Sequence, residues 1–129
     1  ALVGDSGGGK STFVQMLLRY YDPDSGVIKI NSKDIKTYTL ESLKSQISLV
    51  TQNIYIFNDT IKANVAYGYE DIDENRVIDA LKRANAYEFV MQLENGLDTI
   101  MNESGSNLSG GQRQRIAIAR AIYKNSSLL

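Results

Sequence analysis

Apolar residues with two different spacings divide the first half of the chain into strands and helices. Residues 1–3 form a short apolar run that ends at a glycine, which is typical of a buried parallel strand entering a tight loop. Helical spacing runs from residue 10 to residue 20 and stops at the turn-forming residues 22–26. The pattern then predicts a strand at 27–30, a short helix at 40–46 and another strand at 47–50.

The second half of the chain has a mainly helical pattern. Residues 60–87 have helical spacing, residues 94–107 are polar and contain glycine, and a long helix is predicted from Ser109 to about Lys124. Residues 126–129 begin another apolar strand. This alternation predicts an α/β core with a mostly parallel sheet, into which a helical section is inserted.

Four acidic residues, Glu70, Asp71, Asp73 and Glu74, gather inside the helical section. Asp71 and Glu74 have the spacing of a capping box, and apolar residues follow on one helix face at 77, 81 and 84. Such a cluster could also hold a metal ion. Because acidic residues are favoured near helix N-termini, we interpret the run as a helix start rather than a metal site.

The composition excludes several classes of function. Of 129 residues, 43% are hydrophobic and 22% charged, and a net charge of −1 gives no general attraction to nucleic acid or anionic lipid. Cysteine and histidine are absent, which excludes disulfides, thiol catalysis, Cys/His zinc sites and a histidine general base within these residues. The most apolar helical stretch, residues 116–123, is interrupted by Arg120, so no membrane span is predicted.

A glycine-rich loop after the first predicted strand has the spacing of a Walker A phosphate-binding motif: Gly4, Asp5, Ser6, Gly7, Gly8, Gly9, Lys10, Ser11 and Thr12. Glycines let backbone N–H groups converge on an anion, and the positive end of the next helix points at the same place. Lys10 supplies a charge for the β- and γ-phosphates, Ser11 a hydroxyl for Mg²⁺, and Thr12 supports the α-phosphate side. The alternative, a flexible loop with an incidental lysine, is disfavoured by the strand and helix on either side.

A second glycine motif, Leu108 to Gln112, opens the longest predicted helix. Ser109 and Gln112 have the spacing of a capping box, so a well-capped helix is the simplest interpretation. Gly110 and Gly111, however, cost about 1 kcal/mol each relative to alanine in a helix. Their bare N–H groups at a positive helix end suit a second phosphate, which would justify that cost.

The sequence LSGGQRQRIAIARAI, residues 108–122, resembles the signature motif of ATP-binding cassette (ABC) ATPases, and it follows a Walker A loop as it does in that family. The stretch between the two motifs, from residue 39 to residue 100, is similar to the exporter branch, most closely to MsbA-like bacterial lipid A and multidrug exporters. The resemblance covers essentially the whole chain. It implies a P-loop NTPase core made of 1–52 and 119–129, and a helical subdomain, 53–118, that carries the signature motif.

The resemblance gives roles to residues that the pattern alone leaves open. Gln52, otherwise a polar residue at a strand end, matches the Q-loop glutamine that touches Mg²⁺ or the attacking water. Gln52 and Ser11 are therefore the implied metal ligands, and Lys10 and Gln52 the implied catalytic residues. The signature residues implied to contact ATP are Ser109, Gly110, Gly111 and Gln112. In the family that ATP is held by the Walker A loop of a second nucleotide-binding domain, placed head to tail.

The other implied partner is a transmembrane domain, which would be the chain's only contact with the membrane. Residues 53–60 resemble the surface that grips its coupling helices, and Tyr55, Ile56 and Phe57 are either contacts to those helices or local core. The loop before the signature, 100–105, aligns with an exporter loop, although Asn102 stands where a glycine is usual. The implied location is the cytoplasmic face of the inner or plasma membrane.

No nucleic acid partner is implied. Arg113 and Arg115 could contact one, but two arginines on a helix more often form a solvated or salt-bridged face. The alternatives that remain are a soluble ABC ATPase of DNA repair or translation, and a P-loop kinase or GTPase.

The expected activity is ATP binding and hydrolysis that drives export of lipid or hydrophobic compounds through ATP-dependent dimerisation. Both chain ends resemble cuts, and the Walker B aspartate, catalytic glutamate and switch histidine would lie beyond Leu129. We therefore expect the segment alone to bind ATP without turning it over. These residues do not determine the cargo, or whether the two halves of the dimer are identical.

Overall fold

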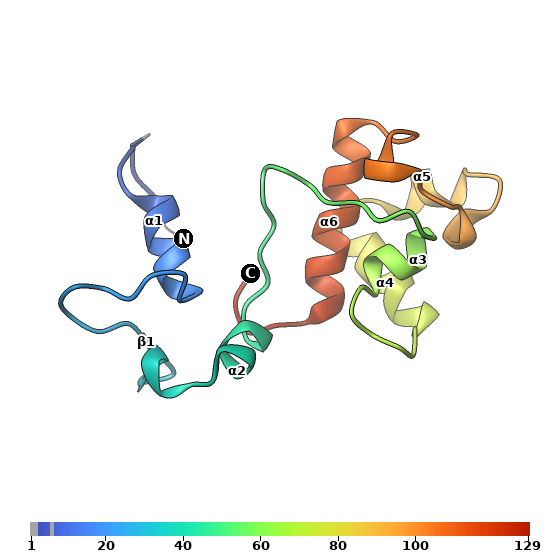
Figure 1. Ribbon diagram of the computed structural model, residues 1–129. Coiled ribbons are helices and arrows are strands. Elements are labelled where there is room, and N and C mark those ends of the chain that lie inside the picture. The colour runs from blue at the N-terminus through green and yellow to red at the C-terminus, as the bar shows by residue number, and fades with distance from the viewer. Residues whose placement is uncertain (1–2, 6) are drawn as a thin grey trace. The chain divides into compact units, whose positions relative to one another are not determined.

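The computed structural model describes residues 3–5 and 7–129, which form two compact units, Ala1–Ile47 and Ser48–Leu129 (Figure 1). Residues 1–2 of the first predicted strand and Ser6 of the glycine loop lie outside the described residues. Each unit has a hydrophobic core of its own. No helix in the described part of the chain combines the length and hydropathy needed to cross a membrane.

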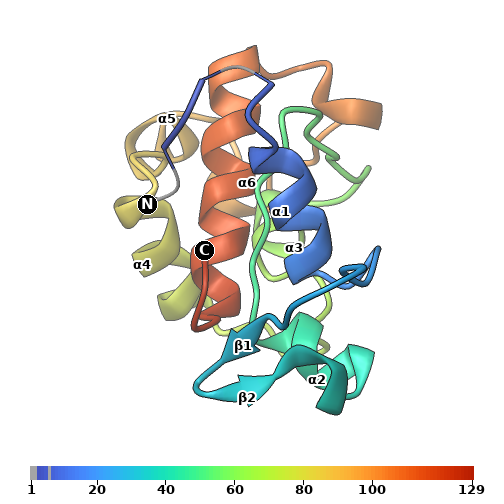
Figure 2. The same cartoon turned by 90° about the vertical axis from the view of Figure 1, so that its left-hand side faces the viewer.

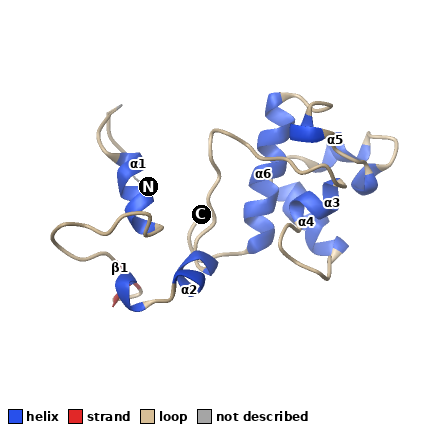
Figure 3. Ribbon diagram, viewed as in Figure 1, coloured by secondary structure: helices blue, strands red, loops and turns tan. Residues whose placement is uncertain are grey.

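The first unit is built from two short helices and a small hairpin, coloured by type in Figure 3. In chain order its elements are α1 (Lys10–Leu17), β1 (Lys29–Ile30), β2 (Lys33–Asp34), the 3-10 turn η1 (Ile35–Thr37) and α2 (Leu40–Ser45). Its core consists of the buried residues Leu18, Ile30, Ile35, Leu43 and Ile47.

Both helices of this unit begin where the sequence predicts. The Thr39 hydroxyl accepts a 3.1 Å hydrogen bond from Ser42 N–H, which caps α2. Helix α1 begins at Lys10 but ends at Leu17, earlier than the predicted residue 20, because Arg19 takes a left-handed conformation with φ of 55°.

β1 and β2 form an antiparallel hairpin that pairs Lys29 with Asp34 and Ile30 with Lys33 (Figure 2). The two connecting residues, at 31 and 32, have φ of 51° and 64°, as a two-residue type I′ turn requires. The predicted strand at 27–30 is thus formed only in its last two residues.

The second unit is helical, and its longest helix is α6 (Figure 1). Its elements are α3 (Ile61–Val65), α4 (Glu74–Arg83), α5 (Tyr87–Met91), the 3-10 turns η2 (Gly96–Asp98) and η3 (Glu103–Gly105), and α6 (Gly110–Lys124). α3 and α4 both pack against α6. The core between them includes Ile61, Val65, Val77, Leu81, Ile116, Ala119 and Tyr123.

The start of α4 differs from the prediction. Asp73 is the capping residue, because its carboxylate accepts a 3.2 Å hydrogen bond from Arg76 N–H, and the predicted Asp71–Glu74 capping box is wrong. Glu74 is instead paired with Lys62 Nζ at 2.9 Å. The predicted apolar face is confirmed, since residues 77, 81 and 84 are all buried.

The mostly parallel sheet is not seen among the described residues, whose one sheet is the β1–β2 hairpin. The segments predicted as strands at 47–50 and 126–129 do not form strands. A backbone hydrogen bond of 2.8 Å nevertheless runs from Ser48 N–H to Leu128 O, so these two segments lie beside each other. A parallel ladder consists of evenly spaced hydrogen bonds along two strands, and neither of these segments is assigned as a strand.

Candidate functional site

The glycine loop leads into the N-terminus of α1, as a phosphate-binding loop requires. Gly7 and Gly9 have φ of 84° and 77°, a conformation that side chains other than glycine's rarely adopt. Gly8 N–H donates to Asp5 O at 3.1 Å, and a Cβ at position 8 would meet the same oxygen at 3.1 Å. Three consecutive glycines therefore have a structural reason in this turn.

Lys10 reaches back into the loop. Its Nζ donates to Gly4 O at 2.6 Å and to Asp5 O at 2.5 Å. Residues 7–12, including the exposed Ser11 and Thr12, line an open pocket of about 290 Å³. An ionised oxygen that entered the turn could therefore replace the two neutral carbonyl oxygens as the acceptor of Lys10 Nζ. Hydrogen bonds to ionised acceptors are stronger than those to neutral ones.

The second glycine motif begins α6 with the predicted capping box. Ser109 Oγ accepts from Gln112 N–H at 3.2 Å, and Gln112 Oε1 accepts from Ser109 N–H at 2.8 Å. Capping uses a lone pair of the Ser109 hydroxyl and leaves its O–H free to donate. Gly110 and Gly111 are exposed, and the helical pattern gives their N–H groups no acceptor within the helix.

Gln52 is exposed and lines a second pocket, of about 900 Å³, with the first residue of α6. The lining residues are Gln52, Asn53, Ile54, Tyr55, Ser104, Ser106, Gly110, Arg113 and Gln114. The structure therefore brings Gln52 and Gly110 to the same hollow of the second unit.

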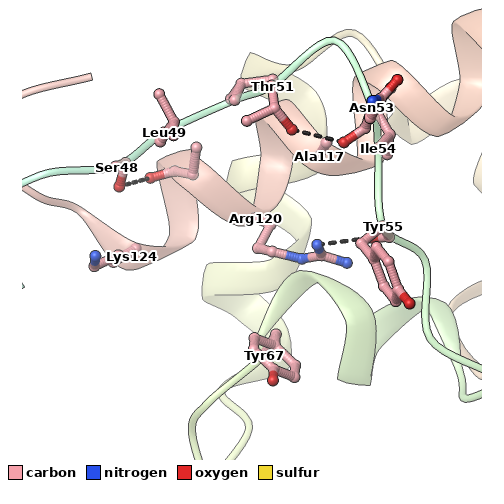
Figure 4. Close-up of a pocket in the computed structure, with 12 residues that line it drawn as sticks. Ser48, Leu49, Thr51, Asn53, Ile54, Tyr55, Tyr67, Ala117, Arg120 and Lys124 are labelled. Carbon is pink, nitrogen blue, oxygen red and sulfur yellow. Dashed lines mark hydrogen bonds between the residues drawn. The ribbon is translucent and has the colours of Figure 1, made fainter. Parts of the chain in front are cut away.

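A third pocket, of about 360 Å³, lies over the C-terminal half of α6 and is shown in Figure 4. It is lined by residues 48–51 and 53–55, by Tyr67, and by Ala117, Arg120, Ala121 and Lys124. Large apolar side chains are exposed at its rim: Tyr55 is 77% exposed, Tyr67 57% and Leu49 47%. We call Leu49, Tyr55, Phe57 and Tyr67 together the aromatic surface, after the three aromatic residues among them.

The sequence left open whether residues of the segment after Gln52 contact a partner or form local core, and the structure gives different residues different roles. Ile56 is buried, with 3% of its surface exposed, and belongs to the core of the second unit. Tyr55 is on the outside, 5.9 Å from the Phe57 ring, and Phe57 stacks on Tyr67 with centroids 4.3 Å apart. Ile56 is therefore local core, whereas Tyr55 remains available to a partner.

Two polar residues that the sequence did not indicate hold this segment in place. Asn64, 1% exposed, accepts from Phe57 N–H at 2.8 Å and donates to Phe57 O at 2.9 Å. Arg120 donates to Tyr55 O at 2.9 Å and to Asn64 O at 2.7 Å. The signal that could have revealed Arg120 is its position inside the most apolar stretch of the long helix, where a lone charge needs a reason.

The arginines at the start of α6 do not form the solvated or salt-bridged face that the sequence suggested, and neither belongs to an ion pair among the described residues. Arg113 Nη1 donates to Leu108 O at 2.7 Å and to Gly105 O at 3.3 Å, which anchors the loop before the signature motif. Arg115 lies over the Phe89 ring, 5.4 Å from its centroid. Because both side chains are half-buried, each packs against the protein instead of facing solvent.

The loop before the signature is closed by asparagines. Asn107 Oδ1 accepts from Asn102 N–H at 3.1 Å, and Asn107 Nδ2 donates to Ile100 O at 3.2 Å. The structure thus gives Asn102 a backbone role at the position where a glycine was expected.

A Walker A turn at a helix start, together with a doubly capped glycine-rich helix start, defines a P-loop nucleotide-binding protein of the ABC ATPase class. The family model of the ABC transporter matches residues 1–129, so the chain belongs to the ABC transporter family. Membership implies nucleotide binding by this domain and the P-loop NTPase fold.

Relatives of known type are similar over the whole chain. The chain is 57% identical to an ATP-dependent lipid A-core flippase of Saccharophagus degradans over 129 residues, and 52% identical to one of Coxiella burnetii, covering 100% and 99% of the chain. A solved bacterial Atm1-family ABC exporter with ATP bound matches 95% of the chain with a TM-score of 0.87 and 44% identity. The chain spans 22% of the length of each of these three proteins.

Proposed function

We propose that the chain is the nucleotide-binding part of an ABC exporter, which binds ATP with Mg²⁺ and, in the full-length protein, hydrolyses it to move lipid or hydrophobic compounds across a membrane. The observation that carries the proposal is the exposed start of α6, where Ser109 and two glycines present free donors in a fixed, capped geometry. Relatives named as lipid A-core flippases support lipid as the cargo class.

In this proposal Lys10 exchanges its two carbonyl acceptors for the β- and γ-phosphate oxygens of ATP. The remaining loop residues, Gly4, Asp5, Ser6, Gly7, Gly8, Gly9 and Thr12, surround the phosphates. Lys10 neutralises the charge that develops on the γ-phosphoryl group, and Gln52 orients the attacking water.

Mg²⁺ suits oxygen donors of the kind that Ser11 and Gln52 offer. It is a hard cation that keeps several waters and binds few protein oxygens beside the phosphates. The Ser11 hydroxyl and the Gln52 side-chain oxygen are the donors that would hold it, and the ion would supply positive charge that offsets the charge of the phosphates. Among the described residues, no group of three or more His, Cys, Asp or Glu side chains offers a competing metal site.

The signature motif serves a second copy of the domain. Ser109, Gly110, Gly111 and Gln112 contact the γ-phosphate of an ATP held by the partner's Walker A loop, so that ATP joins two domains head to tail. Two motifs that each offer donors to phosphate, one in each compact unit, support this arrangement. The lone segment would then bind ATP without turning it over.

The aromatic surface is the proposed seat of coupling helices from a transmembrane domain, with the chain on the cytoplasmic face of the membrane. Exposed Tyr55 and Tyr67 beside a 360 Å³ pocket support this assignment. In the full-length protein, residues 1–52 and 119–129 would join a mostly parallel sheet with strands from elsewhere, and 53–118 would form the inserted helical subdomain.

Equilibrium binding of ATP to the full-length protein, with and without Lys10→Ala, tests the proposal. We expect Lys10→Ala to weaken ATP binding by about tenfold or more, because a charge-assisted contact to phosphate is lost. Lys36→Ala, at an exposed lysine of the same unit, is the matched control and should leave ATP binding unchanged. Equal affinity of the Lys10→Ala variant and the wild type would exclude the assigned phosphate site.

A further inference from the structure

We propose that Arg120 is a positioning residue that ties the aromatic surface to the signature helix, so that a displacement of that surface moves Ser109, Gly110 and Gly111. This inference rests on the proposed function. It concerns a residue outside both glycine motifs, and its basis is the set of contacts that Arg120 makes with the segment after Gln52.

The guanidinium of Arg120 joins three elements at once. Its Nε donates to Asn64 O at 2.7 Å, Nη1 to Tyr55 O at 2.9 Å and Nη2 to Asn64 Oδ1 at 3.1 Å. Figure 4 shows the side chain reaching from α6 to the backbone at Tyr55. α6, α3 and the segment after Gln52 therefore share one rigid, planar group.

The contact is made to a segment that is itself fixed. Asn64 Nδ2 donates to Phe57 O at 2.9 Å and to Thr60 O at 3.1 Å, and Met101 N–H donates to Asp59 O at 2.9 Å. Because both polar ends of the Asn64 amide are used, the backbone of 55–60 has little freedom to move independently of α3.

The same guanidinium lies directly beneath the aromatic surface. It is 5.4 Å from the Phe57 ring centroid and 5.6 Å from that of Tyr67, and these two rings stack on each other. Burial lowers the pKa of Arg120, yet an arginine stays protonated at neutral pH. None of the ion pairs among the described residues involves Arg120, so carbonyl oxygens and ring faces compensate its charge.

The helix that carries Arg120 also carries the signature motif. Arg120 lies ten residues after Gly110 on the uninterrupted helix α6, a distance of about 15 Å along its axis. An unbroken helix transmits a shift at one end to the other, because its hydrogen bonds resist bending. A displacement of Tyr55 or Tyr67 is thus transmitted through Arg120 and α6 to the exposed N–H groups of Gly110 and Gly111.

Arg120→Lys in the full-length protein, reconstituted in vesicles of bacterial lipid extract, tests this role. Lysine keeps the charge and the stem but cannot make three divergent contacts from one plane. We expect the ratio of lipid-stimulated to basal ATPase rate to fall by about threefold or more while ATP affinity changes by less than about twofold. Arg115→Lys makes the same change on the same helix away from the aromatic surface, and should keep the wild-type ratio.

A distance measurement separates positioning from simple stabilisation and does not depend on ATP turnover. Asn58 and Gln114 are both exposed, and spin labels attached to Asn58→Cys and Gln114→Cys report the distance between the segment after Gln52 and α6. We expect a narrow distance distribution in the wild type and with Arg115→Lys, and a broadened one with Arg120→Lys. If Arg120→Lys does not fold, Arg120→Gln, which has no charge to bury and keeps a donor, takes its place in both assays.

Two results would overturn the inference. One is an unchanged stimulation ratio, and the other is a distance distribution as narrow as that of the wild type. Failure of the wild-type protein to bind ATP would count against the proposed function alone, because the distance distribution would still show whether Arg120 holds the segment to α6.

Discussion

Gly105 lies against Ile56 so closely that a Cβ at position 105 would come within 3.1 Å of Ile56 Cγ1 and 3.2 Å of Ile56 Cβ. Gly105 belongs to the loop before the signature motif, and Ile56 to the segment after Gln52. The two segments are therefore in direct van der Waals contact, and Arg113 closes the same contact from α6, with its Cδ 3.1 Å from that Cβ position.

Gly105→Ala is expected to destabilise the fold by about 2 to 5 kcal/mol. A left-handed residue with a Cβ costs about 1–2 kcal/mol, and overpacking against Ile56 and Arg113 adds about 1–3 kcal/mol. The free energy of unfolding from urea titration measures the effect. Gly96→Ala is the matched control, because Gly96 also has positive φ, 49°, but its Cβ would meet only Met91, at 3.8 Å.

The control should therefore lose only the conformational cost, about 1–2 kcal/mol. Equal losses for the two variants would mean that the loop moves freely away from Ile56, contrary to the close packing described above.

Gly111→Ala is expected to raise stability and impair function at once. Nothing lies within 4 Å of a Cβ at position 111, and alanine is better than glycine in a helix by about 1 kcal/mol. The added methyl group would nevertheless shield the N–H groups that we assign to a partner's γ-phosphate. ATP-dependent association, measured by light scattering on the hydrolysis-blocked full-length protein, should weaken while the melting temperature rises.

Ser109→Asn separates capping from phosphate contact at the same helix start. Asparagine caps a helix about as well as serine, so the free energy of unfolding should stay within about 0.5 kcal/mol of the wild-type value. Its amide is larger than the hydroxyl whose free O–H we assign to phosphate, so ATP-dependent association should fall. Wild-type association of this variant would favour a purely structural capping box.

Helix starts were among the more predictable parts of the fold, because the signal of a cap lies within four residues. The Ser109–Gln112 capping box was predicted from such local spacing and is confirmed, and α2 begins at the start of the predicted helix at 40–46. The start of α4 was predicted wrongly because several acidic residues near it could each serve as the N-cap. Contacts with residues far along the chain determine which of them does. Tyr123 Oη, 50 residues away, accepts the Asp73 N–H at 3.3 Å.

Tertiary contacts of polar residues could not be predicted from the sequence. Asn64 and Arg120 are 56 residues apart, and only the folded chain shows that one amide and one guanidinium fix the same backbone segment. The sheet could not be predicted from the pattern either, since an apolar run shows that a segment suits a strand without showing which segment it pairs with. The assigned phosphate contacts stay predictions from motif spacing and local backbone geometry.

Asn64→Ala should destabilise the second unit by about 2 to 4 kcal/mol. The change leaves the half-buried Phe57 N–H and O without their partner and removes an acceptor of Arg120. Unsatisfied groups cost about 1–3 kcal/mol each when fully buried, and partial exposure keeps the loss in the lower part of that range. Urea titration again measures the loss. Asn58→Ala, at an exposed asparagine of the same segment, should change stability by less than about 0.5 kcal/mol. A neutral Asn64→Ala would show that water replaces the amide, and that the segment is held by Arg120 alone.

Lys62 joins three elements of the second unit, with Nζ 2.7 Å from Asp98 Oδ1 and 2.9 Å from Glu74 Oε1. The hydrogen bond to Asp98, and then that to Glu74, raise the pKa of Lys62. Because the pKa of Lys62 is raised in the folded state, its two ion pairs stabilise the fold fully at any pH below the ordinary lysine pKa. This stabilisation is lost as the pH rises through the folded-state pKa. The fall in melting temperature caused by Lys62→Met should therefore be constant from about pH 7 to 9.

The same fall should shrink with added salt, because the ion pairs are exposed to solvent. Lys36→Met replaces an exposed lysine that takes part in none of the ion pairs among the described residues, and should shift the melting temperature little at any of these pH values. A Lys62→Met effect that vanished between about pH 7 and 9 would require a folded-state pKa below the ordinary value. That result would contradict the two ion pairs, because both carboxylates favour the charged form of the lysine.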